Sequence, residues 1–180
     1  MTGEPRFSQV VLKTIVVHTV TYFITGLVAA IVMDYAALYA RPDMAGLMRQ
    51  LSDPMVMAGP LFQPLRGLVF GVVIYLLRDS IFGRKRGWLV LWGTLVGLGV
   101  LSSFGPAPGS IEGLIYTRIT LSHQLIGLPE VLIQSLLLAL GVSYWVEHPG
   151  RRWFSGVMVG AFVVVMLLPV LGLLTTAAGV

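Results

Sequence analysis

The chain has 180 residues, of which 56% are apolar and 11% are charged, whereas soluble domains carry about 25% charged residues. Long apolar runs separate the charged residues, so the composition excludes a water-soluble fold and predicts one all-α integral membrane domain over 1–180, with the lipid bilayer as its partner. The absence of cysteine excludes disulfides, thiolate nucleophiles and cysteine-ligated metals, and the formal charge of +4 indicates membrane topology, with no nucleic-acid partner.

Five segments are long enough to cross a bilayer core, which is about 30 Å thick and takes roughly 20 helical residues. The first is longer than the apolar region of a removable signal peptide, so we expect a true span. An odd number of spans places the two termini on opposite sides of the membrane. The sequence therefore predicts a polytopic helical bundle with spans at about 10–33, 57–77, 88–104, 123–147 and 153–174.

The positive residues are divided unequally between the two sides of this bundle. Eight lie on the N-terminal side: Arg6, Lys13, Arg78, Arg84, Lys85, Arg86, Arg151 and Arg152. The opposite loops hold Arg41, Arg49 and Arg118. Because translocation of positive charge is disfavoured, we expect a multi-pass protein of the inner cell membrane with a cytoplasmic N-terminus and an extracytoplasmic C-terminus.

The connection between the first two predicted spans is too polar to cross the membrane. Apolar side chains recur in it at i, i+3, i+4 and i+7: Met44, Leu47, Met48 and Leu51. This spacing predicts a short amphipathic helix at the outer membrane surface, which Asp43 begins and Asp53-Pro54 ends. A passive lid and a gate are both compatible with the pattern.

Glycines recur at i and i+4 within three of the predicted spans. The pairs are Gly67 and Gly71, Gly93 and Gly97, and Gly156 and Gly160. Such pairs let helix backbones approach closely in lipid. We expect them to pack helices within the chain, and the alternative is an interface with a second copy or with a partner in a membrane complex.

Two ionisable residues lie inside predicted spans, where charge is costly and indicates function. Arg66 and Glu130 are both roughly 12–13 Å from the outer end of their spans if the fourth begins near Ser122. The matched depth predicts an ion pair. In a second interpretation Pro129 begins the fourth span, Glu130 occupies its first turn and Arg66 extends to the headgroups. In a third interpretation, these residues take a direct part in ligand or proton handling.

The connection at 105–128 is rich in proline and glycine and apolar enough to lie in the membrane. We expect a re-entrant or interfacial element there, and a plain surface loop is the alternative. Pro60 and Pro64 predict a kink or a late start in the second span, as in the broken helices of transporters. Together these elements predict an outward-facing cavity with a polar lining: Gln63, Arg66, Glu112, His123, Glu130 and Gln134.

His18 shares a face of the first span with three threonines, Thr14, Thr21 and Thr25. A histidine at this depth either handles protons or forms an interhelical hydrogen bond, and the threonines bond to their own backbone. A haem site needs two histidines at one depth, whereas His123 lies toward the other face. We therefore expect no metal and no cofactor.

Two stretches, GPLFQPLRG at 59–67 and FGPAPGSIEGLIYT at 104–117, carry a resemblance. They are similar to the signature of a group of small bacterial polytopic membrane proteins without an assigned activity. The resemblance implies a bacterial membrane protein and adds no catalytic residue.

No metalloprotease, hydrolase, intramembrane aspartate or phosphate-loop motif occurs in the chain, which favours a protein that is not an enzyme. The leading hypothesis is a membrane protein whose outward-facing cavity binds or passes a small solute or ion. The first alternative is an accessory or assembly subunit of a larger membrane complex. The second is an enzyme that acts on lipid through a titratable group of the cavity.

Overall fold

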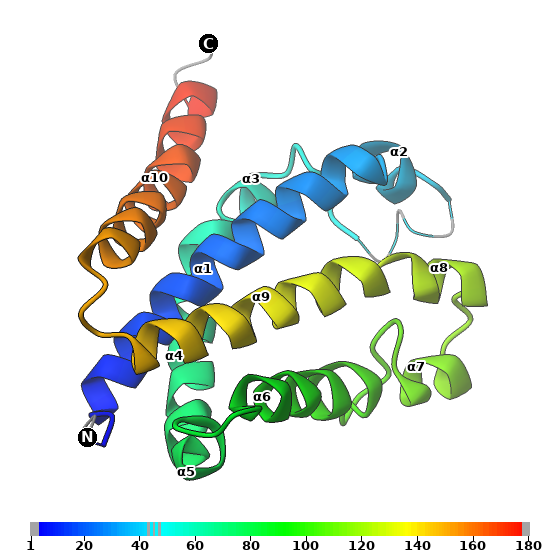
Figure 1. Cartoon of the computed structure of the whole chain (residues 1–180). Coiled ribbons are helices and arrows are strands. Elements are labelled where there is room, and N and C mark those ends of the chain that lie inside the picture. Colours follow the sequence, from blue (N-terminus) through cyan, green and yellow to red (C-terminus); the bar gives the residue numbers. More distant parts are fainter. Residues whose placement is uncertain (1–3, 43, 45, 47, 178–180) are drawn as a thin grey trace.

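The computed structural model describes residues 4–42, 44, 46 and 48–177, and all regular structure in these ranges is helical. The predicted all-α bundle is confirmed (Figure 1). The elements are α1 (Phe7–Val32), α2 (Tyr35–Tyr39), α3 (Pro54–Met57), α4 (Gly59–Leu76), α5 (Arg78–Ile81), α6 (Gly87–Val96), the π-helical turn η1 (Gly97–Leu101), α7 (Ile111–Tyr116), α8 (Leu121–Ile126), α9 (Leu128–Glu147) and α10 (Arg152–Ala177).

Four helical segments of the described chain are long and apolar enough to cross a membrane: α1, α4, α8 together with α9, and α10. The prediction of about five spans needs correction at the third. There α6 has 10 residues and η1 has five, a length of about 22 Å at 1.5 Å per residue. The helical structure ends at Leu101, before the Gly105-Pro106 pair, and proline and glycine do not continue a helix.

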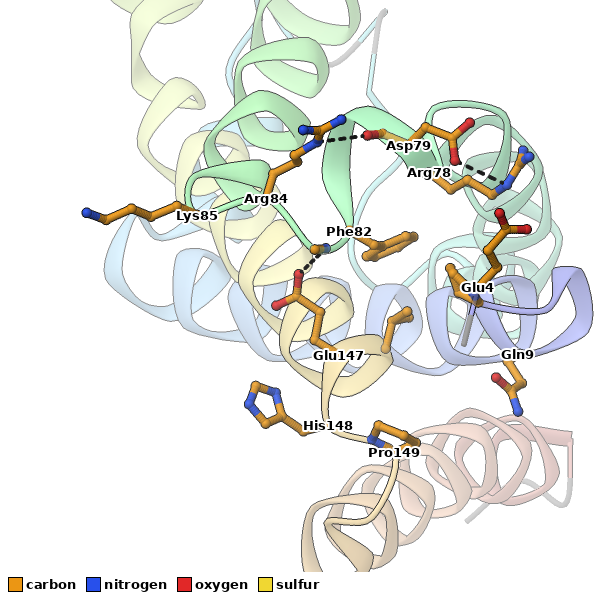
Figure 2. Close-up of a pocket in the computed structure, with 13 residues that line it drawn as sticks. Glu4, Gln9, Arg78, Asp79, Phe82, Arg84, Lys85, Glu147, His148 and Pro149 are labelled. Carbon is orange, nitrogen blue, oxygen red and sulfur yellow. Dashed lines mark hydrogen bonds and ion pairs between the residues drawn. The ribbon is translucent and has the colours of Figure 1, made fainter. Parts of the chain in front are cut away.

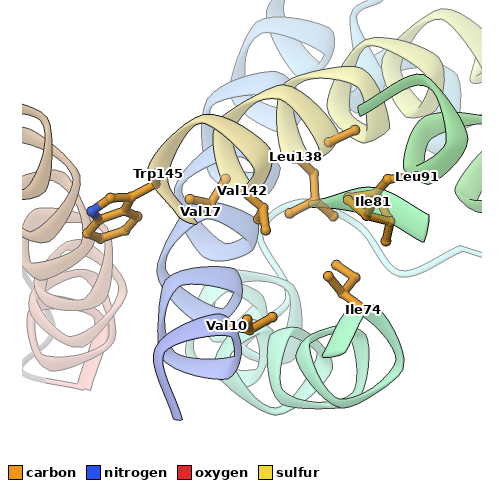
Figure 3. Packing of buried hydrophobic residues seen from close by; sticks show 9 residues of the cluster. Val10, Val17, Ile74, Ile81, Leu91, Leu138, Val142 and Trp145 are labelled. Carbon is orange, nitrogen blue, oxygen red and sulfur yellow. The ribbon is translucent and has the colours of Figure 1, made fainter. Parts of the chain in front are cut away.

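Helix α1 is the centre of the bundle and packs against α4, α9 and α10, while α6 packs on the outer side of α9. A cluster of buried apolar side chains joins α1, α4, α5, α6 and α9 (Figure 3). The N-terminal half of α1 is also bonded to the C-terminal end of α9, since Lys13 Nζ donates to the carbonyl of Trp145 at 2.7 Å.

Helices α1 and α4 run antiparallel and touch backbone to backbone. A Cβ built on Gly67 would lie 2.8 Å from Ile15 Cα, and one built on Gly71 would lie 2.8 Å from Val11 Cα. The prediction of close packing within the chain is therefore confirmed for this pair. It is wrong for the other two pairs, Gly93 with Gly97 and Gly156 with Gly160, where an added Cβ would meet no other part of the described chain within 4 Å.

The bundle has two distinct ends. The α5 end holds the start of α1, α5, and the link from α9 to α10, where Trp145 Nε1 donates to Ser155 Oγ at 2.8 Å. The α2 end holds α2, α3 and α8, and it receives the last turns of α10, since a Cβ on Gly172 would lie 3.4 Å from Met57 Cε. The first and last long helices thus begin at one end and finish at the other (Figure 1).

The connection between α1 and α4 differs from its prediction. Residues 43, 45 and 47 of the predicted surface helix, including its proposed cap Asp43 and Leu47, lie outside the described residues, and described neighbours such as Met44 and Met48 are in turns or bends. Asp53 begins a helix instead of ending one, because its carboxylate accepts from the Met55 backbone at 2.8 Å and Pro54 occupies the first turn of α3.

The close approach of α1 and α4 generates a stability prediction. We expect Gly71→Leu to lower the free energy of unfolding by about 1–3 kcal/mol, because the new side chain meets backbone that cannot turn away. Gly93→Leu is the matched control, since its side chain enters open space. Unfolding in mixed detergent micelles measures both, and equal stability of the two variants would contradict the packing.

Candidate functional site

A group of three polar side chains lies between the long helices and is closed off from the surface. His18 of α1 is 0% exposed and lies between Gln63 of α4 and Gln134 of α9. The two ring nitrogens of His18 are each bonded to one glutamine, Nε2 to Gln63 Oε1 at 3.1 Å and Nδ1 to Gln134 Nε2 at 3.2 Å. We call these three residues the histidine triad.

The hydrogen bonds define one state of the imidazole. The amide nitrogen of Gln134 can only donate, so Nδ1 of His18 accepts, and Nε2 of His18 carries the proton that it donates to Gln63. The ring is therefore held neutral with both nitrogens satisfied. The Phe70 ring packs edge-on against it with centroids 4.9 Å apart. Tyr22 lies one turn further along α1, and its ring centroid is 6.0 Å from that of His18.

The threonines on the same face of α1 take no part in this network. Thr14, Thr21 and Thr25 donate to carbonyls one turn earlier in α1, at 2.7–2.8 Å. These hydroxyls are satisfied by their own helix, as expected for threonine in an apolar environment. Of these four side chains, His18 is the one that the described hydrogen bonds join to other helices.

A pocket of about 590 Å³ opens at the α2 end of the bundle. Four aromatic side chains line it, together with one carboxylate and one guanidinium. They are Tyr22, Phe23, Tyr35, Tyr39, Glu130 and Arg49. Gly26, Leu27, Ala30, Met48, Leu51, Val56, Gly59 and Pro60 complete the lining. The pocket therefore has a mainly apolar wall with a few polar groups, which is the composition of small-molecule sites.

The histidine triad lies directly beneath this pocket. On each of three helices, a pocket residue and a triad residue are four positions apart in sequence, which is about 6 Å along a helix. The pairs are Tyr22 and His18 on α1, Gly59 and Gln63 on α4, and Glu130 and Gln134 on α9. A hydrogen bond also joins the two levels, from Gln63 Nε2 to the Gly59 carbonyl at 3.4 Å.

Glu130 lies in the first turn of α9, which begins at Leu128 with Pro129 beside it. The structure therefore agrees with the interpretation in which Pro129 starts this helix. The Tyr35 hydroxyl of α2 donates to Glu130 Oε2. Burial raises the pKa of Tyr35, and the hydrogen bond and charge of Glu130 raise it further, so the phenol remains a neutral donor. Tyr39 stacks on Tyr35 with ring centroids 5.0 Å apart.

The guanidinium at the rim of the pocket is already paired. Arg49 Nη1 lies 2.9 Å from Asp53 Oδ2. The backbone N–H of Met55 lowers the pKa of Asp53, and the hydrogen bond from Arg49 lowers it further, so the carboxylate stays ionised and neutralises the guanidinium.

The predicted ion pair between Arg66 and Glu130 is absent from the described residues. Arg66 is exposed on α4, and its guanidinium lies over the Phe70 ring, 5.4 Å from the centroid. The depth argument fails because α9 starts at Leu128, so Glu130 is in the first turn, whereas Arg66 lies two turns into α4. The two residues therefore occupy different levels of the bundle.

Glu112 and His123 do not line the pocket. Glu112 is in the first turn of α7, and His123 Nδ1 is bonded to Thr120 Oγ1 at 2.6 Å on α8. The connection between these short helices is held by its own polar groups, since the buried Gln124 Nε2 donates to the Gly113 and Ile119 carbonyls at 3.0 Å each.

The structure thus divides the six predicted cavity residues. Gln63 and Gln134 join His18, Glu130 lines the pocket, and Arg66, Glu112 and His123 lie elsewhere. The sequence argument missed the tyrosines. Tyr35 and Tyr39 have the i, i+4 spacing of one helical face, but they lie in a segment that was predicted only as a surface connection.

A second pocket, of about 820 Å³, lies at the α5 end (Figure 2). Acidic and basic side chains share its lining and are used within the fold. Glu147 Oε1 accepts from the Gly83 backbone at 2.9 Å, and Arg84 Nε donates to the Asp79 carbonyl at 3.2 Å. These bonds stabilise the turn between α5 and α6, so we assign the pocket no ligand.

No three His, Asp or Glu side chains of the described ranges come together as metal ligands. Comparison of the chain with models of protein families, with curated proteins and with solved structures gives no match.

The histidine triad generates a prediction about coupled stability. We expect Gln63→Leu and Gln134→Leu each to lower the free energy of unfolding by about 1–3 kcal/mol, because each leaves a buried ring nitrogen unpaired. The triple variant His18→Leu, Gln63→Leu, Gln134→Leu removes all partners together, so its loss should be smaller than the sum of the single losses. Unfolding in mixed micelles measures these energies, with the exposed Gln9→Leu as control. Strictly additive losses would exclude the network.

Proposed function

We propose that this multi-pass membrane protein binds or passes a small solute or ion through the pocket at its α2 end, with the histidine triad as the floor of that pocket. The observation that carries the proposal is the one-turn step shared by α1, α4 and α9. On each of these helices, a residue that lines the pocket lies one turn from a residue of the triad. Burial of polar groups within a membrane bundle is costly, so their alignment under an open pocket favours function over packing.

The volume of the pocket suits a small ligand. A volume of about 590 Å³ lies within the range of small-molecule pockets, about 300–1,000 Å³. Both glutamine amides can reorient to present the opposite polarity, which would move the imidazole proton of His18 from Nε2 to Nδ1. A solute or proton that reaches the pocket floor would meet this group first.

We further propose that the α2 end faces the outside of the inner membrane. The α5 end carries eight of the basic residues, as counted from the sequence, and basic residues stay in the cytoplasm. The pocket would then open to the extracytoplasmic side.

The orientation is tested by labelling, for which this cysteine-free chain is well suited. Ser52→Cys at the α2 end and Lys85→Cys at the α5 end are both exposed positions. A membrane-impermeant maleimide should label Ser52→Cys in intact cells and Lys85→Cys only after permeabilisation. The reverse pattern would overturn the orientation.

The pocket itself is tested by filling it. A Cβ on Gly26 has only Glu130 Oε1 nearby, at 3.6 Å, so Gly26→Leu projects its side chain into the pocket. We expect the wild-type protein in lipid nanodiscs to bind at least one of three benzyl probes saturably by calorimetry. These are benzyltrimethylammonium, benzyl alcohol and phenylacetate.

Gly26→Leu should lose this binding at least 10-fold, whereas the control Gly160→Leu, which enters open space on α10, should retain it. Absence of saturable binding for all three probes, or equal binding by the two variants, would reject the proposal.

A role as an accessory subunit of a membrane complex is the second candidate, supported by the open glycines. Within the described ranges, two glycine pairs on α6, η1 and α10 have no neighbour within 4 Å of an added Cβ, so these faces allow another helix to approach closely. Gentle detergent extraction followed by native mass spectrometry would show a stable partner in this case and a lone chain if the role is absent.

A further inference from the structure

We infer that the ligand of the α2-end pocket is an organic cation, with Glu130 as its counter-charge and the tyrosine rings as its wall. This inference rests on the proposed function and adds the chemical class of the ligand. Within the described residues, four features of the pocket favour a cation: the unpaired carboxylate of Glu130, the aromatic lining, the pairing of Arg49 with Asp53 and the small number of oxygen ligands.

The carboxylate of Glu130 forms no ion pair with a basic side chain of the described residues. The Tyr35 hydroxyl donates a hydrogen bond to it. The residue is half-buried at the pocket surface. A carboxylate in such a setting favours a positive partner, because the low dielectric of its surroundings strengthens the attraction.

The aromatic wall favours the same charge. Rings of Tyr22, Phe23, Tyr35 and Tyr39 line the pocket together with Glu130, and the Tyr35 hydroxyl is bonded to the carboxylate. The face of an aromatic ring attracts a cation within about 6 Å, and desolvated sites strengthen the effect. Burial and the charge of Glu130 raise the pKa of Tyr39 as well as that of Tyr35, so both phenols remain neutral.

The positive group in the lining does not create an anion site. Arg49 is paired with Asp53, and its side chain is largely exposed at the rim. An anion in the pocket would therefore compete with Asp53 for Arg49 and would also face the charge of Glu130. The electrostatic balance of the pocket disfavours anions.

The cation is organic and not a bare metal ion. Glu130 is the single carboxylate among the pocket-lining residues described, whereas Ca²⁺ and Mg²⁺ require six or more oxygen ligands, usually with several carboxylates. Leu27, Leu51 and Val56 give the pocket apolar surface that a hydrated ion does not use. A quaternary or protonated amine with an apolar substituent uses both parts of the lining.

The experiment compares ligands that share a benzyl group and differ in charge. We expect calorimetry in nanodiscs to show that benzyltrimethylammonium binds at least 10-fold more tightly than benzyl alcohol or phenylacetate. Preference for benzyl alcohol or phenylacetate, with loss in Gly26→Leu, would reject the cation and leave the proposed function standing. Absence of binding for all three would reject both.

Variants assign the preference to particular groups. Glu130→Gln keeps an acceptor for Tyr35 and removes the charge, so it should weaken cation binding at least 10-fold, while Glu112→Gln outside the pocket should not change it. Tyr39→Leu should weaken binding several-fold and Tyr39→Phe should restore it, because the ring is sufficient. Unchanged affinity in Glu130→Gln, with folding verified by circular dichroism and gel filtration, would overturn the inference.

Discussion

The backbone contact between α1 and α4 is the constraint on which the rest of the bundle depends. Gly67 and Gly71 remove the side chains that would separate these helices, and the helices approach until Cα atoms of α1 fill the space. One turn before Gly67, the same close approach brings Gln63 within hydrogen-bond reach of His18. A wider spacing would place the amide out of range, so packing by glycine and the polar network have a common cause.

Polar groups in this bundle are arranged by level. Within the lipid-spanning helices most hydroxyls are satisfied by their own backbone, and the histidine triad satisfies itself between α1, α4 and α9. One turn toward the α2 end, the polar groups open onto a pocket instead of closing on one another. The change from a closed network to an open pocket takes place within about 6 Å along the helices.

The middle of the chain departs from simple spanning helices. Helix α6 passes into the π-helical turn η1 and ends before the short helices α7 and α8. A π-helical turn weakens regular helix geometry and is frequent at functional positions. Here it coincides with Gly97, whose outward face is open, so this region combines an irregular backbone with a surface that accepts close contact.

Sequence patterns alone determined the membrane environment and the long helices, because hydropathy acts within one helix and needs no knowledge of its neighbours. The same patterns marked three glycine pairs but not that only one of them, Gly67 and Gly71, meets another helix of the described chain. They also contained Pro129 and Glu130 at the start of α9, although the sequence did not choose between two starting points. Only the tertiary structure decided which side chains meet. Arg66 lies over Phe70 while Tyr35 bonds Glu130, because helix rotation and the return of α2 over the bundle set these contacts, and neither is encoded in the spacing of a single segment.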